Sequence, residues 1–282
     1  MEEQALQFEP PAAAKPEFLD IGAGSHARRI AFLRRVAAAG CDCAGLVWLG
    51  GFRSNMRGEK ASYLERAAAA AGRACLRFDY SGHGESEGAF ERSTIGMWLE
   101  ESLEAFRALT EGPQILVGSS MGGWLALLVA RTLAESGEGA RLAGLVLIAP
   151  AVDMTEKLIF EQMTRKARAE LERKGVWLRA SPYEAEPHPI RREFIEEGRS
   201  HLLFGATIRS HCPVHILQGM RDEAVPWRHA LALVEHLHGD PVTLTLIKDG
   251  DHRLSRPEDL ARIGAAVEGM DDHRLDKPRA LV

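Results

Sequence analysis

The sequence predicts an α/β fold: a doubly wound, mostly parallel sheet with an inserted helical cap. Short apolar runs alternate with longer segments of helical periodicity, which is typical of parallel strands joined by helices. Residues 151–210 break this alternation, and it resumes from Pro213. We therefore expect a core formed by residues 21–150 and 211–270 and a cap formed by residues 151–210.

The expected elements follow from the apolar patterns in chain order. Residues 28–36 are expected to form an early antiparallel strand, and the cap to hold helical stretches at 154–173 and 194–204. Six further strands are expected at residues 44–49, 74–79, 114–117, 142–148, 214–219 and 242–247. Helices are expected at residues 61–71, 94–109 and directly after Ser120. The acidic, proline-containing start, residues 1–20, is expected to be a flexible arm, and residues 271–282 a loose tail.

The composition excludes several classes of protein. With 282 residues, 45% of them hydrophobic, the chain is long enough for one large domain. A net charge of −5 without basic runs argues against a nucleic-acid partner. No apolar run is long enough to span a bilayer, and the acidic start lacks a secretory pattern, so we expect a cytoplasmic protein. Without a metal-binding motif we expect neither a metal nor another cofactor. We expect all four cysteines to be reduced, because Cys41 and Cys43 are too close for an ordinary bridge.

The strongest functional signal is a glycine-flanked serine between a strand and a helix. Gly118-Ser119-Ser120-Met121-Gly122 follows an apolar run and opens into another, which is the context of a G-x-S-x-G nucleophile elbow. The register makes Ser120 the nucleophile, with its hydroxyl exposed above the sheet. Ser119 is the competitor, but a serine at the end of a strand usually only bonds the backbone.

A serine nucleophile needs a base and an acid that orients the base. Asp222 lies in a loop after one late strand, and His252 lies in a loop after the next. Loops at the carboxyl ends of parallel strands are where such a sheet keeps its site, so we assign Asp222 as the orienting acid and His252 as the base. Other candidates for the acid are Asp153, Glu223, Asp249 and Asp251, and other candidates for the base are His83, His215 and His229.

The oxyanion hole requires two backbone N–H groups aimed at the developing charge. One belongs to Met121, which directly follows the nucleophile. The other is expected from Phe52, after the Gly50-Gly51 pair, with Gly51 as the next choice. We place Gly51 and Trp177 in the substrate pocket, although Trp177 could equally hold the cap together.

Several separated motifs together resemble one known family. The chain resembles the α/β-hydrolase superfamily and, more narrowly, the palmitoyl-protein thioesterase and mycophenolic acid acyl-glucuronide esterase family. The resemblance runs from about Leu46 to about Glu268 and does not include the mitochondrial presequence of that family. The motifs that carry it are Gly51-Phe52-Arg53-Ser54-Asn55-Met56, Lys60-Ala61, Arg77-Phe78-Asp79-Tyr80-Ser81-Gly82, Gly112-Pro113-Gln114-Ile115-Leu116-Val117-Gly118-Ser119-Ser120, Gly122-Gly123-Trp124, Lys174-Gly175-Val176-Trp177, Gly219-Met220, Val225-Pro226-Trp227 and Asp251-His252-Arg253.

The resemblance implies hydrolysis of acyl thioesters or carboxylic esters, including S-palmitoyl proteins and acyl glucuronides. A small ester, a thioester or an S-acylated protein would then be the partner. Two alternatives remain: a peptidase or carbon–carbon-bond hydrolase on the same triad, and a non-catalytic binding protein with the same fold.

Overall fold

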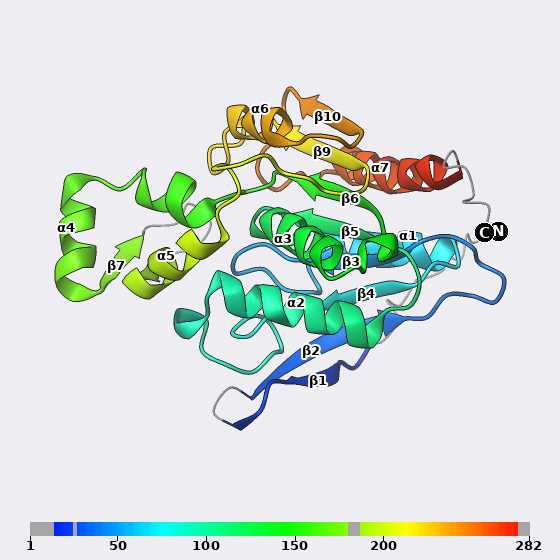
Figure 1. The fold of residues 1–282 in the computed structure, drawn as a ribbon, viewed down its shortest axis with the longest axis horizontal. Coiled ribbons are helices and arrows are strands. Elements are labelled where there is room, and N and C mark those ends of the chain that lie inside the picture. The colour runs from blue at the N-terminus through cyan, green and yellow to red at the C-terminus, as the bar shows by residue number, and fades with distance from the viewer. Residues whose placement is uncertain (1–13, 25–26, 180–186, 276–282) are drawn as a thin grey trace, which may run out of the picture.

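The computed structural model describes residues 14–24, 27–179 and 187–275, with the side chains described as far as residue 271. Figure 1 shows a central sheet with helices on both sides and a smaller lobe at one end. The sheet has eight strands in the order β1-β2-β4-β3-β5-β6-β9-β10. They are β1 (Glu17–Ile21), β2 (Arg28–Arg35), β3 (Gly45–Leu49), β4 (Cys75–Phe78), β5 (Gln114–Ser119), β6 (Leu142–Ile148), β9 (Val214–Gly219) and β10 (Val242–Ile247).

The expected strand directions are confirmed. β2 pairs antiparallel with both β1 and β4, while β3, β4, β5, β6, β9 and β10 are parallel. β5 is buried along its whole length, as expected of a strand with helices on both faces.

Two helical layers cover the sheet (Figure 1). One face packs against α1 (Glu59–Ala70) and α7 (Pro257–Leu275). The other face packs against α2 (Ile95–Leu109), α3 (Met121–Glu135) and α6 (Trp227–His236). Within the described ranges, no helix combines the length and apolar character needed to cross a bilayer.

Residues 151–210, which we call the cap, are inserted in the chain between β6 and β9, two strands that are neighbours in the sheet. The cap holds a π-helix (Met154–Phe160), α4 (Arg165–Lys174) and α5 (Arg192–Gly198). It also contains an unexpected antiparallel hairpin, β7 (Val176–Arg179) with β8 (His188–Arg191). Short 3-10 turns lie in the cap at Arg199–His201 and in the core at Phe90–Arg92 and Gly139–Arg141. Residues 180–186 are outside the described residues.

Three expectations need correction. Residues 17–20, assigned to a flexible arm, form most of β1, because their backbone pairs with β2 from Glu17 to Ile21. Residues 271–275, assigned to a loose tail, continue α7. Cys41 and Cys43 form a disulfide, because their Cα atoms lie 5.6 Å apart, which is within the range of ordinary bridges. Cys75 and Cys212 are buried, reduced thiols, as expected. The outer parts of the arm and tail, residues 1–13 and 276–282, are outside the described residues.

Candidate active site

Ser120 occupies a strained turn between β5 and α3. Its φ of 53° and ψ of −118° are unusual for a residue with a side chain, and such strain is concentrated at functional positions. Three backbone hydrogen bonds hold the turn, because Ser120 N–H donates to Ile148 and the Ser120 carbonyl accepts from Gly123 and Ala151. Ser119 is the last residue of β5 and is only 6% exposed, whereas Ser120 is partly exposed at the turn.

The glycines around Ser120 are required by close backbone contacts. A Cβ on Gly118 would lie 2.3 Å from the Gly122 carbonyl oxygen, and one on Gly122 would lie 2.0 Å from the Leu49 oxygen. A Cβ on Gly51 would lie 3.4 Å from Ser120 Cβ, so the loop after β3 approaches the serine closely. Small residues therefore allow the strand, the helix and this loop to meet at one point.

This crowding gives a stability prediction. We expect Gly122→Ala to lower the free energy of unfolding by about 3 kcal/mol or more, because backbone must move to admit the methyl group. Urea unfolding followed by circular dichroism measures the loss. Gly205→Ala is the matched control, since no atom lies within 4 Å of the added methyl group and Gly205 does not have a positive φ. Equal stability of Gly122→Ala and the unmodified protein would show that the turn is looser than described.

Asp222 is held in place by several donors. Its side chain is fully buried after β9, and Oδ1 accepts hydrogen bonds from the backbone N–H groups of Ala224 and Val225 at 2.9 and 2.8 Å. Oδ2 accepts from Gln218 Nε2 at 3.2 Å and lies 2.7 Å from His252 Nδ1. Four partners around one carboxylate fix its orientation, and the carboxylate fixes the imidazole ring.

His252 lies in the loop after β10, with its side chain 18% exposed. Residues 248–256, which we call the histidine loop, cross the end of β9, since a Cβ on Gly219 would lie 2.6 Å from the Asp251 carbonyl oxygen. Ser120, Asp222 and His252 thus follow the ends of parallel strands at the same edge of one sheet. The other histidines have different partners: His215 bonds Thr245, and His229 bonds the Val152 carbonyl.

The competing acids are engaged elsewhere. Asp153 is buried, and its two carboxylate oxygens accept from the backbone N–H groups of Leu203 and Phe204 in the cap. Asp251 accepts from the N–H groups of its own loop, at Arg253 and Leu254. Asp249 pairs with Arg256, and Glu223 is exposed. Among these acids, Asp222 is the one joined to His252.

The loop after β3 brings a second amide near Ser120. Within the described residues, neither Phe52 N–H nor Met121 N–H has a backbone or side-chain acceptor. His83 fixes this loop, because its Nε2 accepts from Arg53 N–H at 3.1 Å. Burial lowers the pKa of His83 to about 4, so its ring is neutral and able to accept at physiological pH. His83 therefore packs beside the site and fixes the loop after β3.

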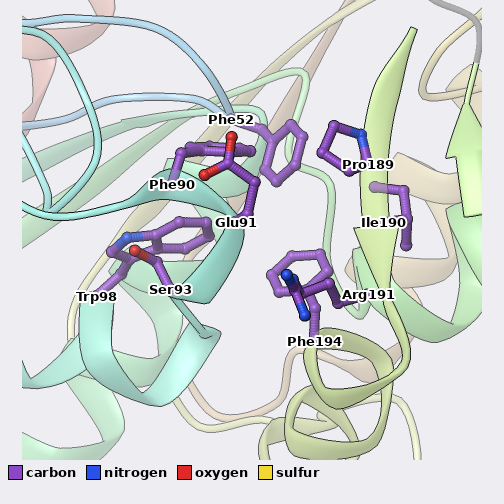
Figure 2. Close-up of a pocket in the computed structure, with 9 residues that line it drawn as sticks. All are labelled: Phe52, Phe90, Glu91, Ser93, Trp98, Pro189, Ile190, Arg191 and Phe194. Atoms are coloured by element: carbon purple, nitrogen blue, oxygen red, sulfur yellow. The ribbon is translucent and has the colours of Figure 1, made fainter. Parts of the chain in front are cut away.

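An apolar cavity lies where the core meets the cap. Figure 2 shows Pro189 of β8 facing the Phe52 ring of the core, with Phe194 of α5 nearby. The Phe52 ring is 4.8 Å from Phe90 and 5.7 Å from Phe194, measured between centroids. These contacts nearly fill the cavity, which has a volume of about 10 Å³, roughly the space of one water molecule. Its lining residues are Phe52, Phe90, Glu91, Ser93, Trp98, Pro189, Ile190, Arg191 and Phe194.

A larger and more polar cavity of about 260 Å³ adjoins the first. Phe90 and Glu91 line both cavities, and Arg53 and His83 line only the polar one. Trp177 lines neither of these two cavities. It lies opposite Ile190 across the β7–β8 hairpin, so the two side chains share a face of the hairpin.

Sequence reasoning missed some residues of this region. Gln218 lies within a predicted strand, yet its buried amide donates to Asp222. Phe90 and Trp98 line the apolar cavity, but only the fold brings them together. The described residues contain no cluster of metal-ligating side chains.

Comparisons with known proteins agree with this architecture. A profile of the alpha/beta hydrolase family matches residues 39–271. The human mitochondrial palmitoyl-protein thioesterase ABHD10 is 36% identical over 229 residues, which are 81% of this chain and 73% of the human protein.

Two solved structures are similar along most of their length. One is a crystal structure of a protein from Agrobacterium vitis S4, with 46% identity, coverage of 91% of this chain and 98% of that one, and a TM-score of 0.87. The other is mouse alpha/beta hydrolase domain-containing protein 10, with 33% identity, coverage of 93% and 100%, and a TM-score of 0.81. The chain belongs to the alpha/beta hydrolase family.

Proposed function

We propose that the protein hydrolyses acyl thioesters or carboxylic esters through an acyl-enzyme on Ser120. The observation that carries the proposal is the 2.7 Å contact between His252 Nδ1 and the buried Asp222 carboxylate, at the sheet edge where Ser120 occupies its strained turn. The relatives named palmitoyl-protein thioesterase support the ester or thioester class.

The first half of the reaction forms the acyl-enzyme. Ser120 Oγ attacks the acyl carbonyl carbon, and its proton passes to His252 Nε2 while Asp222 stabilises the imidazolium. The N–H groups of Phe52 and Met121 donate to the oxyanion of the tetrahedral intermediate. The intermediate collapses, the bond to the thiol or alcohol breaks, and the leaving group takes the proton from His252.

The second half releases the acid. A water molecule gives a proton to His252 and attacks the acyl carbonyl, and the second tetrahedral intermediate expels Ser120 Oγ, which regains the proton. The free carboxylic acid is the product.

We assign the apolar cavity to the acyl group and the polar cavity to the leaving group. The apolar cavity begins at the side chain of Phe52. Because we place the Phe52 amide at the oxyanion, an acyl chain bound to Ser120 reaches this cavity directly. Because the rings nearly fill it, a long chain requires the Phe194 ring to move. The polar cavity, with Arg53, Ser54 and Asn55 in its lining, suits a hydrophilic alcohol or thiol portion.

Cytoplasmic localisation remains a prediction, whereas the curated relatives are named as mitochondrial.

Acyl-chain preference tests the cavity assignment. We expect Phe194→Ala to raise kcat/KM for palmitoyl relative to butanoyl thioesters by about tenfold, because removing the ring opens space for additional methylene groups. Trp177→Ala should change the preference less, since Trp177 acts on the wall through Ile190. The measurement is an acyl-length series of thioesters and p-nitrophenyl esters. Equal effects of Phe194→Ala on every chain length would contradict the assignment, and the same outcome for Trp177→Ala would show that Trp177 does not act on the cavity wall.

A further inference from the structure

A partly buried lysine contacts the histidine loop from outside it. Lys60, the second residue of α1, points its Nζ to the carbonyl oxygen of Arg253, the residue after His252. Within the described residues, no carboxylate lies within ion-pair distance of Nζ. A buried ammonium normally has an anionic partner, because desolvation of a single charge is costly. Its placement on a neutral carbonyl beside His252 therefore suggests a role other than stability.

Side chains help to hold the histidine loop, beside the backbone hydrogen bond from Arg221 N–H to the Gly250 carbonyl. Leu254 is fully buried and has a φ of 43°, which is strained for leucine. Asp251 accepts from the N–H groups of Arg253 and Leu254, and Arg256 pairs with Asp249. The contacts of Asp251 and Arg256 lie within the loop, whereas Arg221 N–H and the Asp222 carboxylate bind it from the region after β9.

Lys60 supplies a contact from another part of the fold. The Arg253 carbonyl accepts from Ser255 Oγ inside the loop and from Lys60 Nζ on α1. α1 begins directly after residues 50–58, the loop that carries the Phe52 amide. The Lys60 ammonium thus joins α1, which follows the loop of the proposed oxyanion donor Phe52, to the histidine loop, which carries the proposed base His252.

We propose that Lys60 is a positioning residue for His252, whose ammonium holds the Arg253 carbonyl and so fixes the histidine loop for catalysis. This inference rests on the proposed function of Ser120, Asp222 and His252. A hydrogen bond from a charged donor is roughly twice as strong as one from a neutral donor. The positioning effect should therefore depend on the charge of Lys60 as well as on its presence.

The charge of Lys60 titrates in an accessible range. Burial, and next the nearby Arg253, lower the pKa of Lys60 from 10.5 to about 8, while Asp251, Glu59 and Asp259 oppose the shift. Above pH 8 the folded protein holds a neutral amine, so we expect kcat to fall. The free energy of unfolding should change in the opposite direction. Between pH of about 8 and 10.5 the Lys60 side chain is protonated in the unfolded chain but largely neutral in the folded protein, so its contribution to stability rises with pH. Loss of activity in this window is then not caused by unfolding.

The test compares Lys60→Met, which removes the charge and the donor, with Lys60→Arg, which retains both. We measure kcat, KM and urea unfolding for each protein between about pH 6.5 and about pH 9.5, a range that spans the titration of Lys60 but not that of arginine. At neutral pH, Lys60→Met should lower kcat about tenfold with KM nearly unchanged, and Lys60→Arg should keep most of the activity. The alkaline decrease of kcat should be present in the unmodified protein and absent from both variants.

The outcomes separate this inference from the proposed function. If the unmodified protein is active but Lys60→Met matches it in kcat and in the alkaline decrease, Lys60 has no positioning role. If Lys60→Met does not fold, the decision rests on Lys60→Arg, and an unchanged alkaline decrease in that variant overturns the inference. An unmodified protein that neither hydrolyses esters nor reacts with a fluorophosphonate overturns the proposed function, and the inference with it.

Discussion

Ser120→Ala is expected to abolish hydrolysis of esters and thioesters, with a loss in kcat on the order of 10³-fold or more. The nucleophilic oxygen is removed, and the other members of the triad cannot act without it. The fold should be retained, because alanine is smaller than serine and the hydrogen bonds of the turn come from the backbone of residue 120. Steady-state kinetics and thermal unfolding of the same preparation measure both effects.

Ser119→Ala is the matched control for this prediction. The two serines are adjacent, but Ser119 lies buried at the end of β5. We expect Ser119→Ala to retain activity within about tenfold, since only an indirect effect through packing is possible. A Ser120→Ala protein that keeps its activity while Ser119→Ala loses it would reverse the assignment of the nucleophile.

Asp222→Asn is expected to lower kcat by about 10⁴-fold, the size of effect found when the orienting acid of a serine triad becomes an amide. The amide cannot stabilise the imidazolium, and it permits the wrong tautomer of His252. Asp222 Oδ1 also accepts two backbone hydrogen bonds, so unfolding measurements must accompany the kinetics. The retained volume of asparagine is the reason to choose it over alanine.

Two other acids serve as controls for Asp222. Asp251→Asn should have a much smaller effect, since Asp251 only accepts from the N–H groups of its own loop. Asp153→Asn should mainly reduce stability, because its buried carboxylate holds the cap backbone at Leu203 and Phe204. If all three variants were equally active, or Asp153→Asn were the least active of the stable variants, the orienting acid would need to be reassigned.

The parts of the fold that sequence reasoning predicted correctly are those set by strong local patterns. Residues 114–123 combine an apolar run, closely spaced glycines and a second apolar run, and their glycines cannot be replaced without backbone clashes. The strand and helix alternation on either side of the cap is equally periodic. The sheet topology and the family match confirm the predicted fold and family, while the roles of Ser120, Asp222 and His252 remain proposals that the geometry supports.

The parts that were missed depend on contacts between distant segments. β1 is a strand because its backbone pairs with β2, and five residues carry too little pattern to show this alone. The β7–β8 hairpin joins residues 176 and 191 across a segment rich in proline. The aromatic cavity combines Phe52, Phe90 and Phe194 from three separate regions. The disulfide was excluded from residue spacing, although the turn between Cys41 and Cys43 leaves their Cα atoms at an ordinary distance.

Peptide mapping by mass spectrometry, after reaction with a fluorophosphonate, tests the central claim most directly. The proposed mechanism predicts one phosphonyl adduct per chain, located on Ser120, whose formation slows when an ester substrate competes and whose rate falls strongly in His252→Ala. An adduct on Ser119, or no adduct on a folded protein, would contradict the claim that this chain is a serine hydrolase acting through Ser120.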